Sequence, residues 1–233
     1  LHEKSSEKML IHQTGSSPEI NKRSQAIKSS LTLGGLDQIK SPHIDLVIWH
    51  RTLPDHFQDW LECLPASNLP QIRILIAPCA VKSALDPMLD ACGLLISDMR
   101  DFLLNDISEL VHYFSIITES ELVDARLEHI DHDSCWRFHR DVVDLRLITT
   151  YLGPGTEWVN PLHAESAIED QKKYAGPLEQ LSLDEVAIFK GKRASATDGI
   201  VHRSPPIEDS GGSRLLLCLN QSSELSPPAW KPD

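Results

Sequence analysis

Two histidines and one aspartate in the second half of the chain have the residue types and spacing of a metal site. His139 and Asp141 lie two positions apart, and His202 follows 63 positions after His139 (202 minus 139). Two imidazoles and one carboxylate can bind one face of an octahedral Fe(II) and leave the opposite positions open for a cosubstrate and oxygen. These three residues therefore predict a metal centre of the oxygenase type.

An arginine extends the pattern. Arg214 follows His202 by 12 positions (214 minus 202), where a neighbouring antiparallel strand could direct its guanidinium at a carboxylate of the cosubstrate. A histidine two positions from an aspartate is a weak signal in a chain with 11 histidines, and the pair alone could be a surface histidine beside a solvated aspartate. The metal hypothesis depends on His202 and Arg214 joining that pair.

A competing cluster lies just before the same motif. His129, His132, Cys135 and His139 are spaced by three, three and four positions. Imidazole and thiolate ligands bind tetrahedral Zn(II). The alternation of a strand sends His129 and His132 to opposite faces, so a compact local site would need a turn at residues 131–133. This zinc site remains an alternative.

Composition narrows the class of protein. The 233 residues, 41% of them hydrophobic, can form one domain or one domain with an appendage, and the net charge of -12 argues against a nucleic-acid partner. Five cysteines without CxxC spacing indicate a reduced, cytoplasmic protein. No apolar run reaches the ~18 residues of a membrane span, and no signal peptide is evident, although the chain begins with Leu1 and an upstream targeting segment could be missing.

The first half of the chain is predicted to support the site. Residues 1–41 are rich in Ser, Lys and Gln and predict a flexible tail. Residues 42–120 predict a mixed helical and αβ supporting region, with strands at 44–49 and 71–77 and helices at 54–64, 80–90 and 97–117.

From residue 121 the apolar period falls to two. Residues 121–222 predict the metal-binding core, with strands at 122–129, 146–152, 184–191, 199–204 and 214–220, and residues 223–233 predict a C-terminal tail. Strands joined by short turns, with helices confined to the front of the chain, predict an α+β fold built on an antiparallel sandwich or barrel.

Several motifs resemble those of one family known only as a domain of unknown function. They are CWRFHRD, LRLITTYLGPGTEWV, EVAIFKG, and HRSPP followed by RLLLCLN. The resemblance runs from about Val123 to Asn220 and is weaker in the helical front half. Genes of that family often neighbour zinc-homeostasis GTPases. The resemblance therefore implies, as one alternative, a non-enzymatic zinc-binding protein that acts with a metallochaperone GTPase.

The order of motifs is also similar, more distantly, to the double-stranded β-helix dioxygenases that use Fe(II) and 2-oxoglutarate, such as prolyl hydroxylases. The shared elements are the HxD motif, Tyr151 and Leu152 before the GPG turn, an apolar strand that enters Gly191, then His202 and Arg214. This similarity implies a jelly-roll, cupin-like fold.

The dioxygenase similarity also implies roles for the site residues. His139, Asp141 and His202 would bind Fe(II). Arg214 would pair with the distal carboxylate of 2-oxoglutarate, and Tyr151 or Thr149 would donate a further hydrogen bond to this cosubstrate. The alternative for Tyr151 is a core aromatic.

Other polar and aromatic residues near these motifs have more than one interpretation. Arg146, five positions after Asp141, could orient that carboxylate or face solvent. His163 is left out of the ligand set, and Trp136 and Trp158 could wall a substrate pocket or belong to the core.

Three hypotheses follow. The leading one is a non-haem Fe(II)- and 2-oxoglutarate-dependent oxygenase acting on a small-molecule or protein substrate. The second is the zinc-binding protein with its GTPase partner, and the third is a binding module whose pocket has lost its chemistry.

Overall fold

The computed structural model describes residues 26–232 and arranges its strands in two sheets. The larger sheet has the order β1-β2-β8-β5-β10-β4-β3 and the smaller the order β7-β6-β9. Neighbouring strands pair antiparallel throughout, except for the parallel pair β1 and β2. The strands are β1 (Ile27–Ser30), β2 (Leu46–Trp49), β3 (Gln71–Ile76), β4 (Val123–Ile130), β5 (Leu145–Leu152), β6 (Glu157–Val159), β7 (Glu179–Gln180), β8 (Val186–Lys190), β9 (Val201–Arg203) and β10 (Arg214–Gln221).

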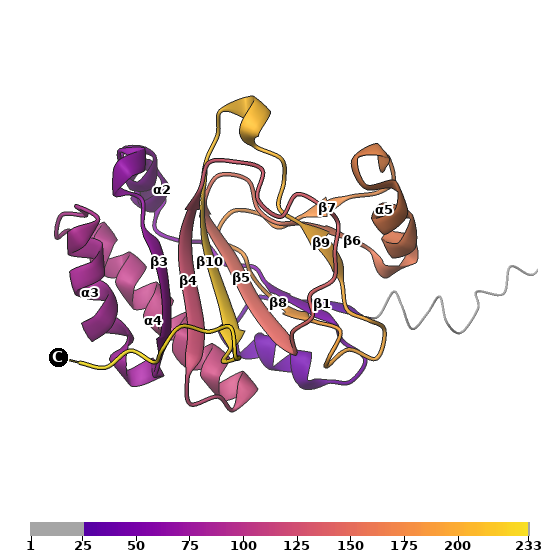
Figure 1. The fold of residues 1–233 in the computed structure, drawn as a ribbon, viewed down its shortest axis with the longest axis horizontal. Coiled ribbons are helices and arrows are strands. Elements are labelled where there is room, and N and C mark those ends of the chain that lie inside the picture. Colours follow the sequence, from indigo (N-terminus) through magenta and orange to yellow (C-terminus); the bar gives the residue numbers. More distant parts are fainter. Residues whose placement is uncertain (1–25, 233) are drawn as a thin grey trace, which may run out of the picture.

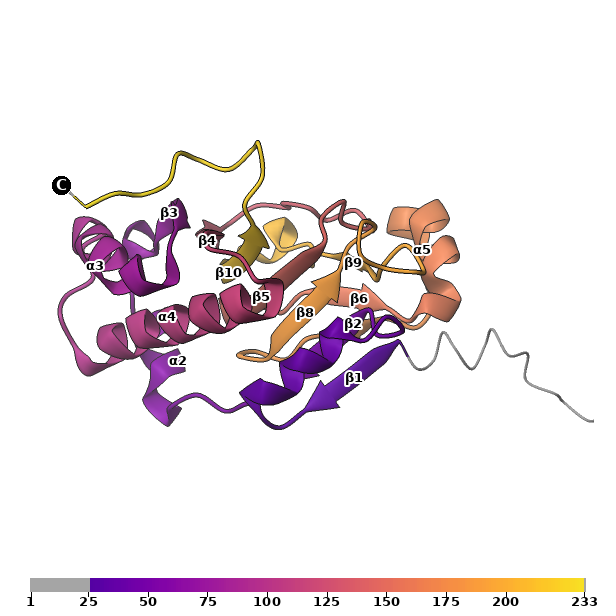
Figure 2. The same ribbon diagram turned by 90° about the horizontal axis from the view of Figure 1, so that it is seen from below.

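Helices cover the outer face of the larger sheet, and the smaller sheet packs on its other face (Figure 1). The 3-10 helix η1 contacts β2 and β8, whereas α4 contacts β4 and β10, so the two helices cover different halves of that face (Figure 2). The helices are η1 (Leu33–Lys40), α2 (Asp55–Glu62), α3 (Val81–Ala91), α4 (Asp98–Thr118) and α5 (Ala164–Asp170), and short 3-10 turns connect several elements.

The long helix α4 follows from its sequence. The Ser97 side chain accepts a hydrogen bond from the backbone N–H of Arg100 at 3.2 Å and caps the N-terminus. Leu103, Ile107 and Leu110 recur at helical spacing and are completely buried against the sheet. This apolar stripe holds α4 on the larger sheet.

The alternation of side chains along each strand separates two cores. On β5, Leu147 and Tyr151 belong to the core beneath the helices, whereas Ile148 belongs to the core between the two sheets. On β10, Leu217 points to the helices and Cys218 to the smaller sheet. Two facing sheets with helices outside form the predicted jelly-roll, of the double-stranded β-helix type, within an α+β fold.

The flexible tail predicted for residues 1–41 is corrected in its second part. Residues 1–25 lie outside the described residues, but β1 pairs with β2, and η1 buries Leu36 and Ile39 completely. Two apolar side chains among polar neighbours are enough to fix one short helix, and the average composition of the segment concealed them.

The predicted division between a supporting region and a core also differs from the structure. β2 and β3, from residues 42–120, pair with β8 and β4 and are part of the larger sheet. The predicted C-terminal tail lies beside β3, where the backbone N–H of Trp230 donates to the carbonyl of Leu75 at 2.8 Å. The front half of the chain therefore completes the sheet as well as supporting it.

The sequence patterns missed β6, β7 and α5. β6 and β7 have three and two residues, too few to show a period of two, and α5 places a helix in the second half of the chain. Within residues 26–232, no helix has the length and apolar character that a membrane crossing requires.

Candidate metal centre

His139 and His202 are placed side by side by one short backbone pairing. His202 lies in β9 and is buried, with 3% of its surface exposed. His139 follows β4 in an irregular segment and forms an isolated antiparallel bridge with His202, with both backbone N–H···O distances at 3.0 Å. Residues directly opposite each other in an antiparallel pair project to the same face. The two rings accordingly lie 4.6 Å apart between centroids.

Asp141 projects to the same point. Its Oδ1 lies 3.7 Å from Nε2 of His139, and its Oδ2 lies 3.4 Å from Nε2 of His202. One potential ligand atom from each of the three residues lies within 4.8 Å of the other two. The structure thus brings together the three residues that the sequence analysis selected as metal ligands.

The hydrogen bonds of the two rings fit a cation. Nδ1 of His139 lies 2.8 Å from the carbonyl of Arg137, and Nδ1 of His202 lies 3.0 Å from the carbonyl of Ile200. A carbonyl can only accept, so each Nδ1 carries a proton, and Nε2 is the ring nitrogen that each histidine directs at Asp141. Burial of the ring and the neighbouring His202 lower the pKa of His139 below its usual 6.5, which favours this neutral form. Two imidazole nitrogens and a carboxylate directed at one point can share a bound metal ion.

Arg146 holds the Asp141 carboxylate. Its Nη1 donates to Oδ1 of Asp141 at 2.6 Å, while its Nε donates to Oδ1 of Asn220 at 2.8 Å. Within residues 26–232, the buried Oδ2 of Asp141 accepts no hydrogen bond and is free to bind a metal. Burial opposes ionisation of Asp141, but His202 and then Arg146 outweigh it and lower the pKa of the carboxyl to about 2. Asp141 is therefore a carboxylate at neutral pH. Of the two interpretations of Arg146, the structure supports the one in which it orients this carboxylate.

Arg146→Lys is expected to weaken metal binding by about 10-fold, because lysine keeps the positive charge but cannot hold Asp141 and Asn220 with one planar group. Titration with Co(II) against a competing chelator measures the affinity. The matched control is Arg193→Lys, at an exposed position, which should bind Co(II) as the wild type does. Equal affinities for the Arg146 variant and the wild type would contradict the orienting role.

Arg214 is a completely buried cation with only neutral partners. Its Nε donates to the carbonyl of Pro154 at 2.7 Å and its Nη1 to Oγ of Ser204 at 2.9 Å, while Nη2 lies 3.4 and 3.3 Å from the hydroxyls of Thr150 and Thr156. No acidic side chain of residues 26–232 forms an ion pair with it. Burial lowers the pKa of Arg214 to about 10, so the guanidinium stays charged at neutral pH.

The GPG turn after β5 makes this placement possible. Gly153 has a φ of +77°, and a Cβ on it would lie 2.1 Å from the carbonyl oxygen of Ser213. Only glycine tolerates both conditions. The turn can therefore pack against the start of β10 and present the carbonyl of Pro154 to Arg214.

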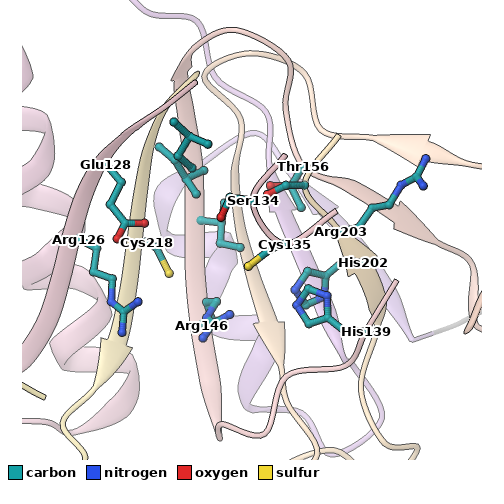
Figure 3. Close-up of a pocket in the computed structure, with 14 residues that line it drawn as sticks. Arg126, Glu128, Ser134, Cys135, His139, Arg146, Thr156, His202, Arg203 and Cys218 are labelled. Carbon is teal, nitrogen blue, oxygen red and sulfur yellow. The ribbon is translucent and has the colours of Figure 1, made fainter. Parts of the chain in front are cut away.

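A cavity of about 100 Å³ lies between the two sheets beside these residues. Its lining includes His139, His202, Ser204 and Thr156, and Figure 3 shows the two imidazoles on one side of it. Arg214 does not line the cavity itself but lies behind Ser204 and Thr156, to which it is hydrogen-bonded or close. The two candidate histidine ligands therefore line the cavity, and the buried guanidinium lies behind two other residues of its lining.

Thr149 and Tyr151 are not in this space. The Tyr151 hydroxyl donates to Oδ2 of Asp106 at 2.6 Å, and its ring packs edge-on against Phe57 in the core beneath the helices. Adjacent residues of a strand point to opposite faces, so Thr150, between the two, is the residue that reaches Arg214. The sequence predicts that side chains alternate between the two faces of β5, but it does not predict which face borders the cavity.

Tyr151→Phe is expected to lower the free energy of unfolding by about 1–2 kcal/mol, since a buried hydrogen bond to a carboxylate is lost. Metal affinity should not change, because the hydroxyl lies on the far side of the sheet. Urea denaturation and Co(II) titration of the same preparation measure the two quantities. A loss of metal affinity at unchanged stability would place Tyr151 in the site after all.

The local zinc cluster is not assembled. Within residues 26–232, His139, Asp141 and His202 form the one group of three or more histidine, cysteine or acidic side chains placed to share a metal. His132 is exposed and its ring contacts Asp131 at 3.2 Å, whereas Cys135 lines the cavity.

The remaining sequence candidates lie away from the cavity lining. Trp158 is buried in the core between the sheets, and Trp136 stacks with the side chains of Arg137 and Lys172. His163 ends a 3-10 turn before α5. The residues that the sequence analysis missed are polar positions on the inner face of the sheets, namely Arg126, Glu128, Thr156 and Ser204.

Fold and site together define a jelly-roll protein with a two-histidine, one-carboxylate cluster. The chain belongs to the family described as "Protein of unknown function (DUF1826)", which matches residues 30–220. The family resemblance drawn from the motifs is thereby confirmed. No curated protein matches the chain.

Solved structures similar to this one include a dioxygenase, a hydroxylase and a carbocyclase. Dioxygenase for auxin oxidation 1 from Arabidopsis thaliana, in complex with 2-oxoglutarate, has 10% identity and a TM-score of 0.48 over 87% of this chain and 95% of its own. A prolyl-4-hydroxylase from Pseudomonas putida has 11% identity and a TM-score of 0.39 over 82% and 94%. The non-haem α-ketoglutarate-dependent carbocyclase SnoK from nogalamycin biosynthesis has 8% identity and a TM-score of 0.35 over 86% and 88%.

Proposed function

We propose that this protein is an oxygenase that depends on non-haem Fe(II) and 2-oxoglutarate. The observation that carries the proposal is the convergence of His139, Asp141 and His202 beside a cavity, with Arg214 behind Ser204 and Thr156 of its lining. Two imidazoles and one carboxylate on one side of a metal are the ligand set of non-haem Fe(II) oxygenases. The arrangement favours metal binding, since the Nδ1 hydrogen bonds leave Nε2 of each ring directed at the site and Asp141 is ionised.

Arg214 would bind the distal carboxylate of 2-oxoglutarate. A buried guanidinium with only neutral acceptors has lost its hydration without gaining a counter-ion, which is unfavourable. A carboxylate would supply the missing counter-ion and could accept two parallel hydrogen bonds from Arg214. Ser204 and Thr156, between Arg214 and the cavity, would reorient their hydroxyls to complete this site.

The bound iron and 2-oxoglutarate would supply the oxidising chemistry, in which one oxygen molecule converts 2-oxoglutarate to succinate and carbon dioxide and oxidises the substrate. The protein would contribute binding and orientation. Arg146 would fix the direction of the Asp141 carboxylate, and the apolar side chains of Ile148 and Leu216 would exclude water from the cavity.

Anaerobic titration with Fe(II) and 2-oxoglutarate tests this function. The proposal predicts a weak visible charge-transfer band that requires both additions, and formation of succinate when oxygen is admitted. Tight zinc binding with no such band and no succinate would overturn the proposal.

The zinc-handling alternative has less support. Its local cluster of His129, His132 and Cys135 is not brought together within residues 26–232. Zn(II) also accepts two imidazoles and a carboxylate, so competition between zinc and iron belongs in the same titration. A metallochaperone GTPase partner remains a prediction from the family resemblance.

A further inference from the structure

A second cavity adjoins the one lined by His139 and His202, and two arginines line both. This second cavity, of about 160 Å³, lies where β10 ends and is lined by Arg73, Arg193 and Asp144 among others. Arg126 and Arg146 line both cavities. The two spaces therefore meet at these two arginines, close to the candidate metal ligands.

Arg126 differs from Arg146 in having no bound acceptor. Arg146 donates hydrogen bonds to both Asp141 and Asn220. Within residues 26–232, the buried Nε of Arg126 has no hydrogen-bond partner, and it forms one long ion pair, with Oδ1 of Asp124 at 3.8 Å. That carboxylate is already held by both Nε and Nη2 of Arg73, at 3.2 and 2.8 Å.

The strand pairing makes the position of Arg126 less favourable still. Arg73 on β3 lies directly opposite Arg126 on β4, and like charges at paired positions repel. The Arg126 side chain is 35% exposed, but its buried Nε lacks an acceptor beside a second cation, and an anion bound there would supply one. Arg126 therefore favours an anionic ligand group at the junction of the two cavities.

An open carboxylate lies on the same face. Glu128 is two positions after Arg126 on β4, so both side chains point between the sheets. Within residues 26–232, the Glu128 side chain forms no ion pair with Arg126 and no hydrogen bond. Figure 3 shows Arg126 and Glu128 on one wall, with His139 and His202 across the cavity. Arg126, whose one ion pair is the long contact with Asp124, and Glu128, which forms no ion pair within residues 26–232, thus face the candidate metal centre.

We propose that this wall is the substrate site and that it binds a zwitterion of the amino-acid type. Arg126 receives the carboxylate and Glu128 the ammonium group, so that the carbon skeleton lies toward His139 and His202. A ligand with only one charge satisfies one side chain and is repelled by the other, which gives the site its selectivity. This assignment rests on the proposed function, because it makes the zwitterion the molecule that is oxidised.

Equilibrium dialysis against three matched sets of probes tests the site. The probes are the free amino acids, their carboxamides, which lack the carboxylate, and their N-acetyl derivatives, which lack the ammonium group. With Mn(II) and 2-oxoglutarate present under anaerobic conditions, at least one free amino acid should bind about 10-fold or more tightly than both of its derivatives.

Two variants test which side chain binds which charged group of the amino acid. Arg126→Gln should reduce the affinity of that amino acid to the level of its carboxamide, and Glu128→Gln to the level of its N-acetyl derivative. Arg126→Lys should recover part of the affinity. Lys28→Gln, which removes a positive charge from an exposed position of β1, is the matched control and should bind as the wild type does. Circular dichroism checks that each variant is folded.

The inference is overturned if no free amino acid binds better than its two derivatives, or if the Arg126 and Glu128 variants retain that preference. The first result is expected if Arg126 and Glu128 simply pair with each other in solution. The dialysis does not depend on turnover. Selective binding without the charge-transfer band would contradict the oxygenase proposal and support the zwitterion site. The band without selective binding would support the oxygenase proposal and contradict the zwitterion site.

Discussion

His202→Ala is expected to reduce Fe(II) affinity by more than about 100-fold, because it removes one of three proposed ligands, and loss of a supporting hydrogen bond alone costs about 10–100-fold. The side chain is buried and its Nε2 faces the Asp141 carboxylate, so no other donor of residues 26–232 is placed to substitute for it. Anaerobic competition with a chromophoric chelator measures the affinity. Circular dichroism of the metal-free variant should be that of the wild type.

His132→Ala is the control for this result. His132 is exposed and lies outside the cluster, so its loss should leave Fe(II) affinity unchanged. The opposite pattern, in which the His132 variant loses metal and the His202 variant retains it, would support the local zinc cluster instead.

Arg214→Gln is expected to raise the dissociation constant of 2-oxoglutarate by about 10- to 150-fold, since a hydrogen bond to a charged group contributes about 1.5–3 kcal/mol. Metal affinity should change little, because Arg214 does not contact the three ligands. Arg214→Lys should recover only part of the loss, because an ammonium group cannot form two parallel hydrogen bonds with a carboxylate. Fluorescence titration of the Mn(II)-loaded protein with 2-oxoglutarate measures the constant.

Removal of a buried arginine can also destabilise the fold, and Arg100 supplies a matched control. Arg100 is 2% exposed, and it bonds Asp86 and Asp90 in the helical layer, away from the cavity. Arg100→Gln should lower stability without weakening 2-oxoglutarate binding. If both variants weaken binding equally, the effect of Arg214 is structural and its proposed role is wrong.

The sequence predicted the sheet well where alternation was strong. The strands that became β4, β5, β8, β9 and β10, and the helices that became α2, α3 and α4, lie where their apolar periods placed them. The polar face of β4 shows the limit of this method. Arg126 and Glu128 alternate with buried apolar residues as they would on a solvent-exposed strand, but they face a cavity between two sheets. Periodicity separates two faces and does not say what covers the polar one.

The site was predictable where it depended on residue type, and less so where it depended on orientation. Two histidines, an aspartate and an arginine were selected by their chemistry. The fold brings the histidines and the aspartate together and places Arg214 behind Ser204 and Thr156, which line the same cavity as the histidines. Tyr151 was selected from its motif, and the pleat of β5 turned it toward Asp106. The bridge between His139 and His202 joins two short segments through a single residue pair, which no local pattern encodes.

The most direct test of the metal centre is a crystal structure of the protein with Mn(II) and 2-oxoglutarate, with the metal located by its anomalous scattering. The account predicts one metal ion within about 2.3 Å of Nε2 of His139, Nε2 of His202 and a carboxylate oxygen of Asp141, with 2-oxoglutarate extending from the metal toward Arg214. An ion bound elsewhere, or one that leaves any of the three side chains uncoordinated, would contradict it.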